Sequence, residues 1–140
     1  MTVFDKRFES KSHIWKTPKY LYDELNKEFH FQLDPCTTYN NLNCKYFFTE
    51  KEDGLKQDWK SMTAYVNPPY GRELAKWAKK CYEEWMKGST IVLLLQTNRT
   101  NTKWFHKYVY KKAELRFLDH RLQFEGASDK IPTPYMLAVY

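Results

Sequence analysis

The run Ile91–Leu95, five consecutive apolar residues, constrains the fold more than any other feature of the sequence. It has the length of a strand and is far too short to span a bilayer. Uninterrupted apolar strands are typical of parallel sheets, in which helices cover both faces. The run, extended by Thr90, therefore predicts a central strand in an α/β protein.

Three helices are predicted around this strand. The first runs from Pro18 to Phe29, with Thr17 as its N-cap and Pro18 at the first helical position, which proline favours. The other two cover Arg72–Lys87 and Asn101–Lys112, where apolar residues recur at helical spacing. Helices therefore alternate with strands over most of the chain.

The remaining strands are predicted at residues 31–33, 46–48, 63–66, 114–118, 121–124 and 135–140. The last three follow one another without room for helices, so they predict an antiparallel end to the sheet. The whole pattern predicts a doubly wound, mostly parallel sheet with an antiparallel C-terminal hairpin, which is a Rossmann-like fold.

Residues 1–12 are polar and charged, so we expect a flexible tail there and a single domain over residues 13–140. The three cysteines form no Cys-x-x-Cys pair, which is typical of reduced thiols in the cytoplasm. No His or Cys lies at metal-ligand spacing. We therefore expect no metal, no membrane span and no obligate protein partner.

The net charge of +6 is unevenly distributed. Residues 72–121 contain twelve Lys or Arg and only five Asp or Glu. Such an excess favours a polyanionic partner such as DNA, and Arg99 and Arg121 are candidate phosphate contacts. A solvated helix face with scattered lysines explains the charge equally well.

The segment Asn67-Pro68-Pro69-Tyr70 follows a predicted strand and precedes a predicted helix. In doubly wound sheets, ligands bind beyond the carboxyl ends of the strands. The Asn67 side chain and the Pro68 backbone each offer a carbonyl oxygen, and the two prolines hold the loop rigid. Tyr70 offers a ring on which a flipped base can stack.

These groups suit methylation of an exocyclic amine. The amine is a poor nucleophile, because its lone pair is delocalised into the aromatic ring. Two acceptors aimed at its N–H bonds would favour a localised lone pair, which is preorganised electrostatic stabilisation. The alternative is a rigid turn without chemistry, since Asn-Pro is a common turn pair.

The tetrapeptide resembles the catalytic motif of the amino methyltransferases, and the wider sequence resembles the phage-type DNA N-6-adenine methyltransferases. The matching stretches occur in the order of that family and cover about residues 13–140. They are residues 15–18, 31–36, 46–47, 53–55, 58–59, 67–71, 92–95, 102–106, 116–117 and 121–124.

This resemblance implies a Rossmann-like methyltransferase that transfers a methyl group from S-adenosyl-L-methionine to the amino nitrogen of adenine in DNA, in a bacterial cytoplasm. It implies that Asn67, Pro68, Pro69 and Tyr70 hold the target base. The implied cofactor contacts are Thr17 and Pro18 near the methionine end, Asp34, Pro35 and Cys36 in a turn after the first strand, and Asp53 near the adenine.

The sequence departs from most methyltransferases in having no glycine after the first predicted strand; its four glycines are Gly54, Gly71, Gly88 and Gly126. This favours a rival interpretation, a nucleic-acid-binding protein with a decayed methyltransferase fold. A second rival is an enzyme that methylates RNA or a protein glutamine, because the tetrapeptide suits any planar amine or amide.

Overall fold

A computed structural model describes residues 16–37 and 44–140, and its centre is a six-stranded sheet of order β2-β1-β3-β4-β6-β5. The neighbours from β2 to β4 are parallel, whereas β6 is antiparallel to both β4 and β5. The predicted mostly parallel sheet with an antiparallel C-terminal pair is confirmed. The strands are β1 (Leu33–Thr37), β2 (Tyr46–Thr49), β3 (Ala64–Val66), β4 (Ile91–Gln96), β5 (Glu114–Phe117) and β6 (Tyr135–Val139).

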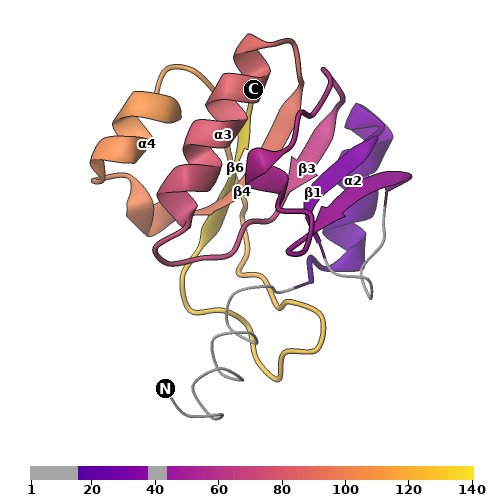
Figure 1. The fold of residues 1–140 in the computed structure, drawn as a ribbon. Coiled ribbons are helices and arrows are strands. Elements are labelled where there is room, and N and C mark those ends of the chain that lie inside the picture. The colour runs from indigo at the N-terminus through magenta and orange to yellow at the C-terminus, as the bar shows by residue number, and fades with distance from the viewer. Residues whose placement is uncertain (1–15, 38–43) are drawn as a thin grey trace, which may run out of the picture.

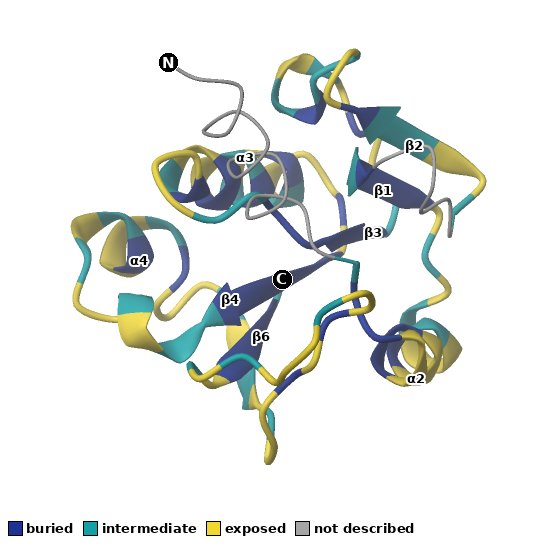
Figure 2. Cartoon of the chain, turned by 90° about the horizontal axis from the view of Figure 1, so that it is seen from below, coloured by how far each residue is buried: buried dark blue, intermediate teal, exposed yellow. Residues whose placement is uncertain are grey.

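Helices cover both faces of the sheet. Helix α2 (Lys19–Phe29) lies on one face, and α3 (Leu74–Met86) and α4 (Lys103–Tyr108) lie on the other (Figure 1). Figure 2 shows buried β4 between these two layers. Two short 3₁₀ helices, η1 (Gly54–Lys56) and η2 (Thr97–Arg99), complete the described elements.

The central strand β4 supplies both hydrophobic cores. Its alternate residues Ile91, Leu93 and Leu95 pack with the apolar face of α3, and Val92 and Leu94 pack with α2. All five are completely buried. Successive strand residues point to opposite faces, so an uninterrupted apolar run is what a sheet covered on both sides requires.

The start of α2 differs from the prediction. Pro18 is the N-cap, and no side chain caps the helix, so Thr17 is not the capping residue. The Thr17 hydroxyl instead bonds to Tyr65 and Asn67, two long-range partners that outcompete a local cap. Helix α4 is also shorter than predicted, because the chain leaves the helix at Val109, which is buried in the core.

The first strand is displaced toward the C-terminus relative to the prediction. We predicted a strand at residues 31–33 and a turn at Asp34-Pro35-Cys36, but those three residues lie within β1. The pairing of β1 with β2 shifts between Asp34 and Thr37. An irregularity of this kind tolerates a proline, which cannot donate to a regular ladder.

The strand predicted at residues 121–124 is wrong. Leu122 and Phe124 alternate as strand residues do, but both are buried against the α2 side of the core. The only bridge in this part of the described chain joins Glu125 to Lys16. The predicted tail, residues 1–12, lies outside the described residues, and no helix in the described ranges is long and apolar enough to cross a membrane.

Candidate active site

The segment Asn67–Tyr70 occupies the edge of the sheet at which the parallel strands end. It follows β3 directly, and its last residue, Tyr70, lies four residues before the start of α3 at Leu74. Asn67 and Pro68 are buried, and Pro69 and Tyr70 are half-buried. The strand exit predicted for the tetrapeptide is therefore confirmed.

The Asn67 side chain is held by contacts at both ends of its amide. Its Nδ2 donates to the Thr17 hydroxyl at 3.1 Å, and its Oδ1 accepts from the Tyr70 hydroxyl at 3.0 Å. Thr17 in turn lies 2.8 Å from the Tyr65 hydroxyl. These contacts fix which end of the amide presents its oxygen to the edge of the sheet.

Tyr70 is anchored to the two strands beyond β3. Its hydroxyl lies 3.2 Å from the backbone oxygen of Leu94 on β4, and its ring meets Tyr135 on β6 edge-on at 5.6 Å. Burial raises the pKa of Tyr70 well above its usual range, so the phenol stays protonated and remains a donor. The tetrapeptide is therefore a rigid part of the sheet edge.

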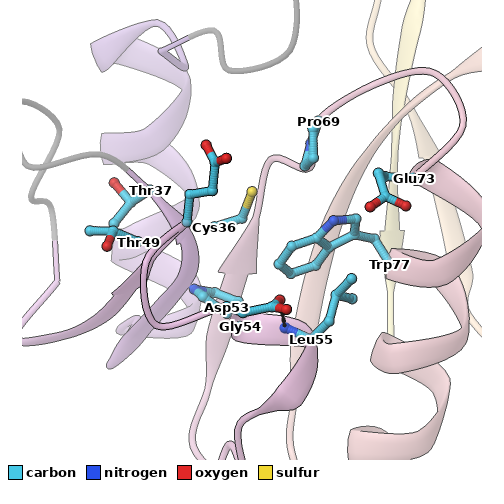
Figure 3. Close-up of a pocket in the computed structure, with 11 residues that line it drawn as sticks. Cys36, Thr37, Thr49, Asp53, Gly54, Leu55, Pro69, Glu73 and Trp77 are labelled. Carbon is cyan, nitrogen blue, oxygen red and sulfur yellow. Dashed lines mark hydrogen bonds between the residues drawn. The ribbon is translucent and has the colours of Figure 1, made fainter. Parts of the chain in front are cut away.

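A cavity of about 320 Å³ opens beside the tetrapeptide, between the ends of β1 and β2, η1 and the start of α3. Figure 3 shows Trp77 of α3 and Glu73, the N-cap of α3, across from Cys36 and residues 53–55, with Pro69 at the rim. The lining residues are Pro35, Cys36, Thr37, Thr49, Glu50, Asp53, Gly54, Leu55, Pro69, Glu73 and Trp77.

The cavity is acidic although the chain is basic. Glu50, Asp53 and Glu73 contribute three carboxyl groups, whereas no Lys or Arg from residues 16–37 and 44–140 lines the space. Trp77 and Leu55 add an apolar surface. Carboxylates bind hydroxyl and cationic groups, and apolar side chains bind an aromatic ring, so the lining suits a cationic, hydroxyl-bearing ligand with an aromatic portion.

Gly54 packs directly on β1. A Cβ added there would lie 2.0 Å from the Pro35 backbone oxygen and 3.1 Å from the Trp77 ring. Only glycine permits this approach. The close contact of η1 with β1 therefore requires a glycine at residue 54.

Comparison with known proteins identifies the family. A model of the family described as DNA N-6-adenine-methyltransferase (Dam) matches residues 6–134. The chain belongs to the Dam family. A DNA N-6-adenine-methyltransferase of Haemophilus phage HP1 (strain HP1c1) is 26% identical over 140 residues, which cover 94% of this chain and 80% of the phage protein. The predicted resemblance is therefore confirmed.

The structure of this Dam-family chain separates the predicted cofactor residues into groups. Pro35, Cys36 and Asp53 line the cavity together with Pro69 of the tetrapeptide. Thr17 contacts Asn67 instead. Pro18 lines a different, shallow hollow, between the start of α2 and residues 123–127.

The two predicted phosphate contacts occupy different surroundings. Arg99 ends η2 and donates from Nε to the Gln96 side chain at 3.1 Å. Burial raises the pKa of Tyr135 to about 12, and the nearby charge of Arg99 opposes that rise. Arg99 therefore lies near Tyr135, whose ring contacts Tyr70 of the tetrapeptide. Arg121 is exposed in the segment between β5 and β6.

Seven cavity residues were not predicted from the sequence. Trp77 was assigned only to the apolar face of a helix, and Gly54 only to a turn. Glu50 directly follows β2 and Glu73 directly precedes α3, and this position next to an element is the one signal that marks them. The seven are Thr37, Thr49, Glu50, Gly54, Leu55, Glu73 and Trp77.

Across residues 16–37 and 44–140, no three His, Cys, Asp or Glu side chains are grouped to hold a metal.

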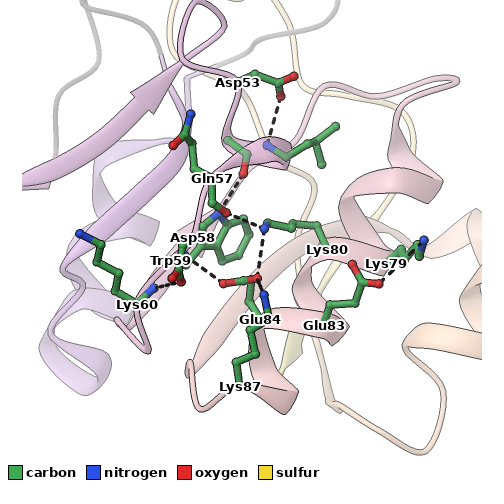
Figure 4. A network of polar contacts seen from close by, with 12 residues as sticks. Asp53, Gln57, Asp58, Trp59, Lys60, Lys79, Lys80, Glu83, Glu84 and Lys87 are labelled. Carbon is green, nitrogen blue, oxygen red and sulfur yellow. Dashed lines mark hydrogen bonds and ion pairs between the residues drawn. The ribbon is translucent and has the colours of Figure 1, made fainter.

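A buried polar network braces the cavity wall from behind (Figure 4). Trp59 Nε1 donates to the Gly54 oxygen at 2.9 Å, and the Glu84 carboxylate accepts from the Trp59 backbone at 2.9 Å and from Lys80 at 3.0 Å. Burial disfavours the charge of Glu84, but bonds from Trp59, Lys80 and Lys87 outweigh it and lower the pKa. The network links η1 to α3 and so fixes both walls of the cavity.

Asp34 lies behind the cavity wall and does not line it. It is 4% exposed, and its Oδ1 accepts from the Cys36 backbone at 3.1 Å. Burial raises the pKa of Asp34 to about 7, although bonds from Cys36 and Thr37 oppose the rise. Its contact with Cys36 shapes the strand β1, which carries the three lining residues Pro35, Cys36 and Thr37.

We expect Asp34 to make stability depend on pH. A folded pKa of about 7 against about 3.9 when unfolded means that the folded chain holds a proton that the unfolded chain has lost. The free energy of unfolding should therefore fall as pH rises from about 4 to 7, and then level off. In Asp34→Asn this slope should be shallower, as measured by urea unfolding at a series of pH values. Equal slopes in the two proteins would contradict the assignment.

Proposed function

We propose that this chain is a site-specific, adenine-specific DNA methyltransferase that uses S-adenosyl-L-methionine, on a Rossmann-like scaffold. One observation carries the proposal: Pro69 belongs both to the tetrapeptide suited to an exocyclic amine and to the lining of the acidic cavity. A site for the base and a site for the methyl donor are therefore contiguous. The family and the phage relative support DNA and adenine as the substrate.

The cavity fits the methyl donor by size and chemistry. Its volume of about 320 Å³ falls in the range of small-molecule sites. Glu50, Asp53 and Glu73 offer acceptors for ribose hydroxyls and for an amino group, and Trp77 and Leu55 offer a surface for the adenine ring. S-Adenosyl-L-methionine supplies an electrophilic methyl group on a sulfonium, whose positive charge an acidic pocket also favours.

The tetrapeptide would bind the target adenine. The side-chain carbonyl of Asn67 and the backbone carbonyl of Pro68 would be the acceptors for the amino group. The Tyr70 ring offers a stacking surface for a base taken out of the duplex. Thr17 would act by holding the amide of Asn67, and its predicted place near the methionine end of the cofactor remains a prediction.

Catalysis would then rest on positioning and on preorganised acceptors. The methyl group would pass directly from the sulfonium to the amino nitrogen without a covalent enzyme intermediate, so that the S–CH3 bond breaks, the donor leaves as the neutral thioether and the proton of the nitrogen goes to solvent. Cys36, the one cysteine in the cavity lining, has its thiol pKa raised well above the usual value by burial, which does not suit a nucleophile. A bacterial cytoplasm is the expected place of action, in keeping with the phage relative.

The test is to incubate the protein with isotopically labelled S-adenosyl-L-methionine and, separately, DNA, RNA and protein extract. Mass spectrometry of nucleosides should find labelled N6-methyladenine from DNA, and sequencing of the methylated DNA should find one short motif. Label in RNA or in protein glutamine alone would overturn the assignment of DNA. Nucleic-acid binding without any labelled product would favour the decayed fold.

A further inference from the structure

The basic residues of the chain are concentrated beyond α3. Between Trp85 and Glu114 the sequence contains six Lys or Arg and no Asp or Glu. Five of these six lie in or next to η2 and α4, namely Arg99, Lys103, Lys107, Lys111 and Lys112. This segment carries an uncompensated positive charge in its own sequence.

The lysines of α4 and the residues after it differ from the lysines of the other helices, which have carboxylate partners. Lys79 of α3 pairs with Glu83 at 3.8 Å, and Lys27 of α2 pairs with Glu24 at 3.2 Å. In the part of the chain that the structure describes, none of the four lysines from 103 to 112 forms an ion pair, and all four are exposed. Two of them instead lie over neighbouring rings, Lys107 over Tyr108 at 5.3 Å and Lys111 over Tyr110 at 5.6 Å.

This surface begins next to the tetrapeptide. Tyr70 meets Tyr135 edge-on, and Tyr135 pairs with Gln96 across β6 and β4. The Gln96 side chain accepts from Arg99, and α4 starts four residues later at Lys103. A short path of contacts therefore joins the proposed base site to the cationic helix, whereas the acidic cavity lies on the other side of the tetrapeptide, toward β1 and β2.

We propose that the η2–α4 surface, defined as Arg99, Lys103, Lys107 and Lys111, binds the phosphate backbone of the duplex that carries the target adenine. The inference rests on the proposed function and names the surface that holds its substrate. Cations beside a base site, three of them exposed lysines without a carboxylate partner among the described residues, complement a polyanion. Phosphate contacts of this kind orient a duplex without reading its sequence. The acidic cavity would repel the same phosphates, so the cavity would bind the methyl donor and the η2–α4 surface would bind DNA.

The test compares two double variants that lose the same charge. Lys103→Gln/Lys107→Gln changes the η2–α4 surface, and Lys27→Gln/Lys79→Gln changes two exposed lysines that have carboxylate partners. Fluorescence anisotropy would measure the affinity of each protein for a DNA duplex between about 50 and 200 mM salt. Each lost phosphate contact reduces the magnitude of the slope of log affinity against log salt by about 0.9, so the slope for Lys103→Gln/Lys107→Gln should be smaller by about 1.8. The drop in affinity over this salt range should therefore be roughly tenfold smaller than in the wild type.

Steady-state methylation gives an independent result. Lys103→Gln/Lys107→Gln should raise KM for DNA and leave kcat and the affinity for S-adenosyl-L-methionine unchanged, because neither lysine contacts the reacting atoms. Lys27→Gln/Lys79→Gln should behave as the wild type does. If both variants methylate and bind DNA alike, the proposed surface is wrong and the proposed function stands. If the wild type binds RNA in preference to DNA and yields no N6-methyladenine in DNA, both proposals are wrong.

Discussion

Asn67→Ala is expected to lower the rate of methyl transfer about a hundred- to a thousandfold, the typical cost of losing one preorganised polar group. The Asn67 oxygen would accept a bond from the adenine amino group, and alanine offers no acceptor in its place. The fold should survive, because the neighbouring prolines and the anchors of Tyr70 on β4 and β6 remain. Thermal melting, donor affinity by calorimetry and the yield of N6-methyladenine would be measured together.

Variants of Tyr70 serve as controls, because they separate the ring from the hydroxyl. Tyr70→Ala removes the stacking surface and should weaken capture of the base. Tyr70→Phe keeps the ring beside Tyr135 but loses the hydroxyl, whose single hydrogen is shared between the Asn67 and Leu94 oxygens, so it should cost about 0.5–1.5 kcal/mol of stability and retain activity. An Asn67→Ala protein that is destabilised by about 1 kcal/mol yet fully active would leave the tetrapeptide as a rigid turn.

Gly54→Ala is expected to disable donor binding and to destabilise the protein. The new methyl group would lie 2.0 Å from the Pro35 backbone oxygen, so η1 has to move away from β1. Overpacking of this kind costs about 1–3 kcal/mol, and breaking the Trp59 bond to the Gly54 oxygen adds about 1–3 kcal/mol for a buried group without its partner. Displacing η1 also moves Asp53 and Leu55 out of the cavity wall.

Gly126→Ala provides the matched control. Gly126 has a φ of +87°, and nothing lies within 4 Å of the position that a Cβ would take. Its substitution should therefore cost only the backbone strain, about 1–2 kcal/mol, without changing the cavity. Calorimetry with S-adenosyl-L-methionine at a temperature where both variants are folded distinguishes them. Equal donor affinity in the two would show that the contact of η1 with β1 does not shape the donor site.

The sequence predicts the fold where periodicity and burial agree. β3, β4, α2 and α3 lie close to their predicted positions because each presents an apolar pattern of the right period to the core. Residues 34–36 were predicted as a turn because Asp-Pro is common in turns, but the local irregularity of β1 accommodates the proline. Leu122 and Phe124 show that alternate burial does not require a strand partner.

The position of the tetrapeptide after β3 was predictable because its residues are contiguous in sequence, whereas the lining of the cavity was only partly predictable. Its walls combine residues from 35 to 77 that no local pattern links. The proximity of Gly54 to Pro35, and of Thr17 to Asn67, arises from tertiary packing alone. Sequence therefore indicates candidate residues at the strand end, and the fold is needed to show which side chains surround them.

β6 follows all the other strands in the chain but lies inside the sheet, between β4 and β5. During synthesis, residues 97–134 emerge while one edge of the apolar strand β4 still has no partner. An exposed strand edge is a template for pairing with another chain, and pairing across so long a separation is slow. The nascent chain is therefore most prone to aggregation in the interval before Tyr135–Val139 leaves the ribosome.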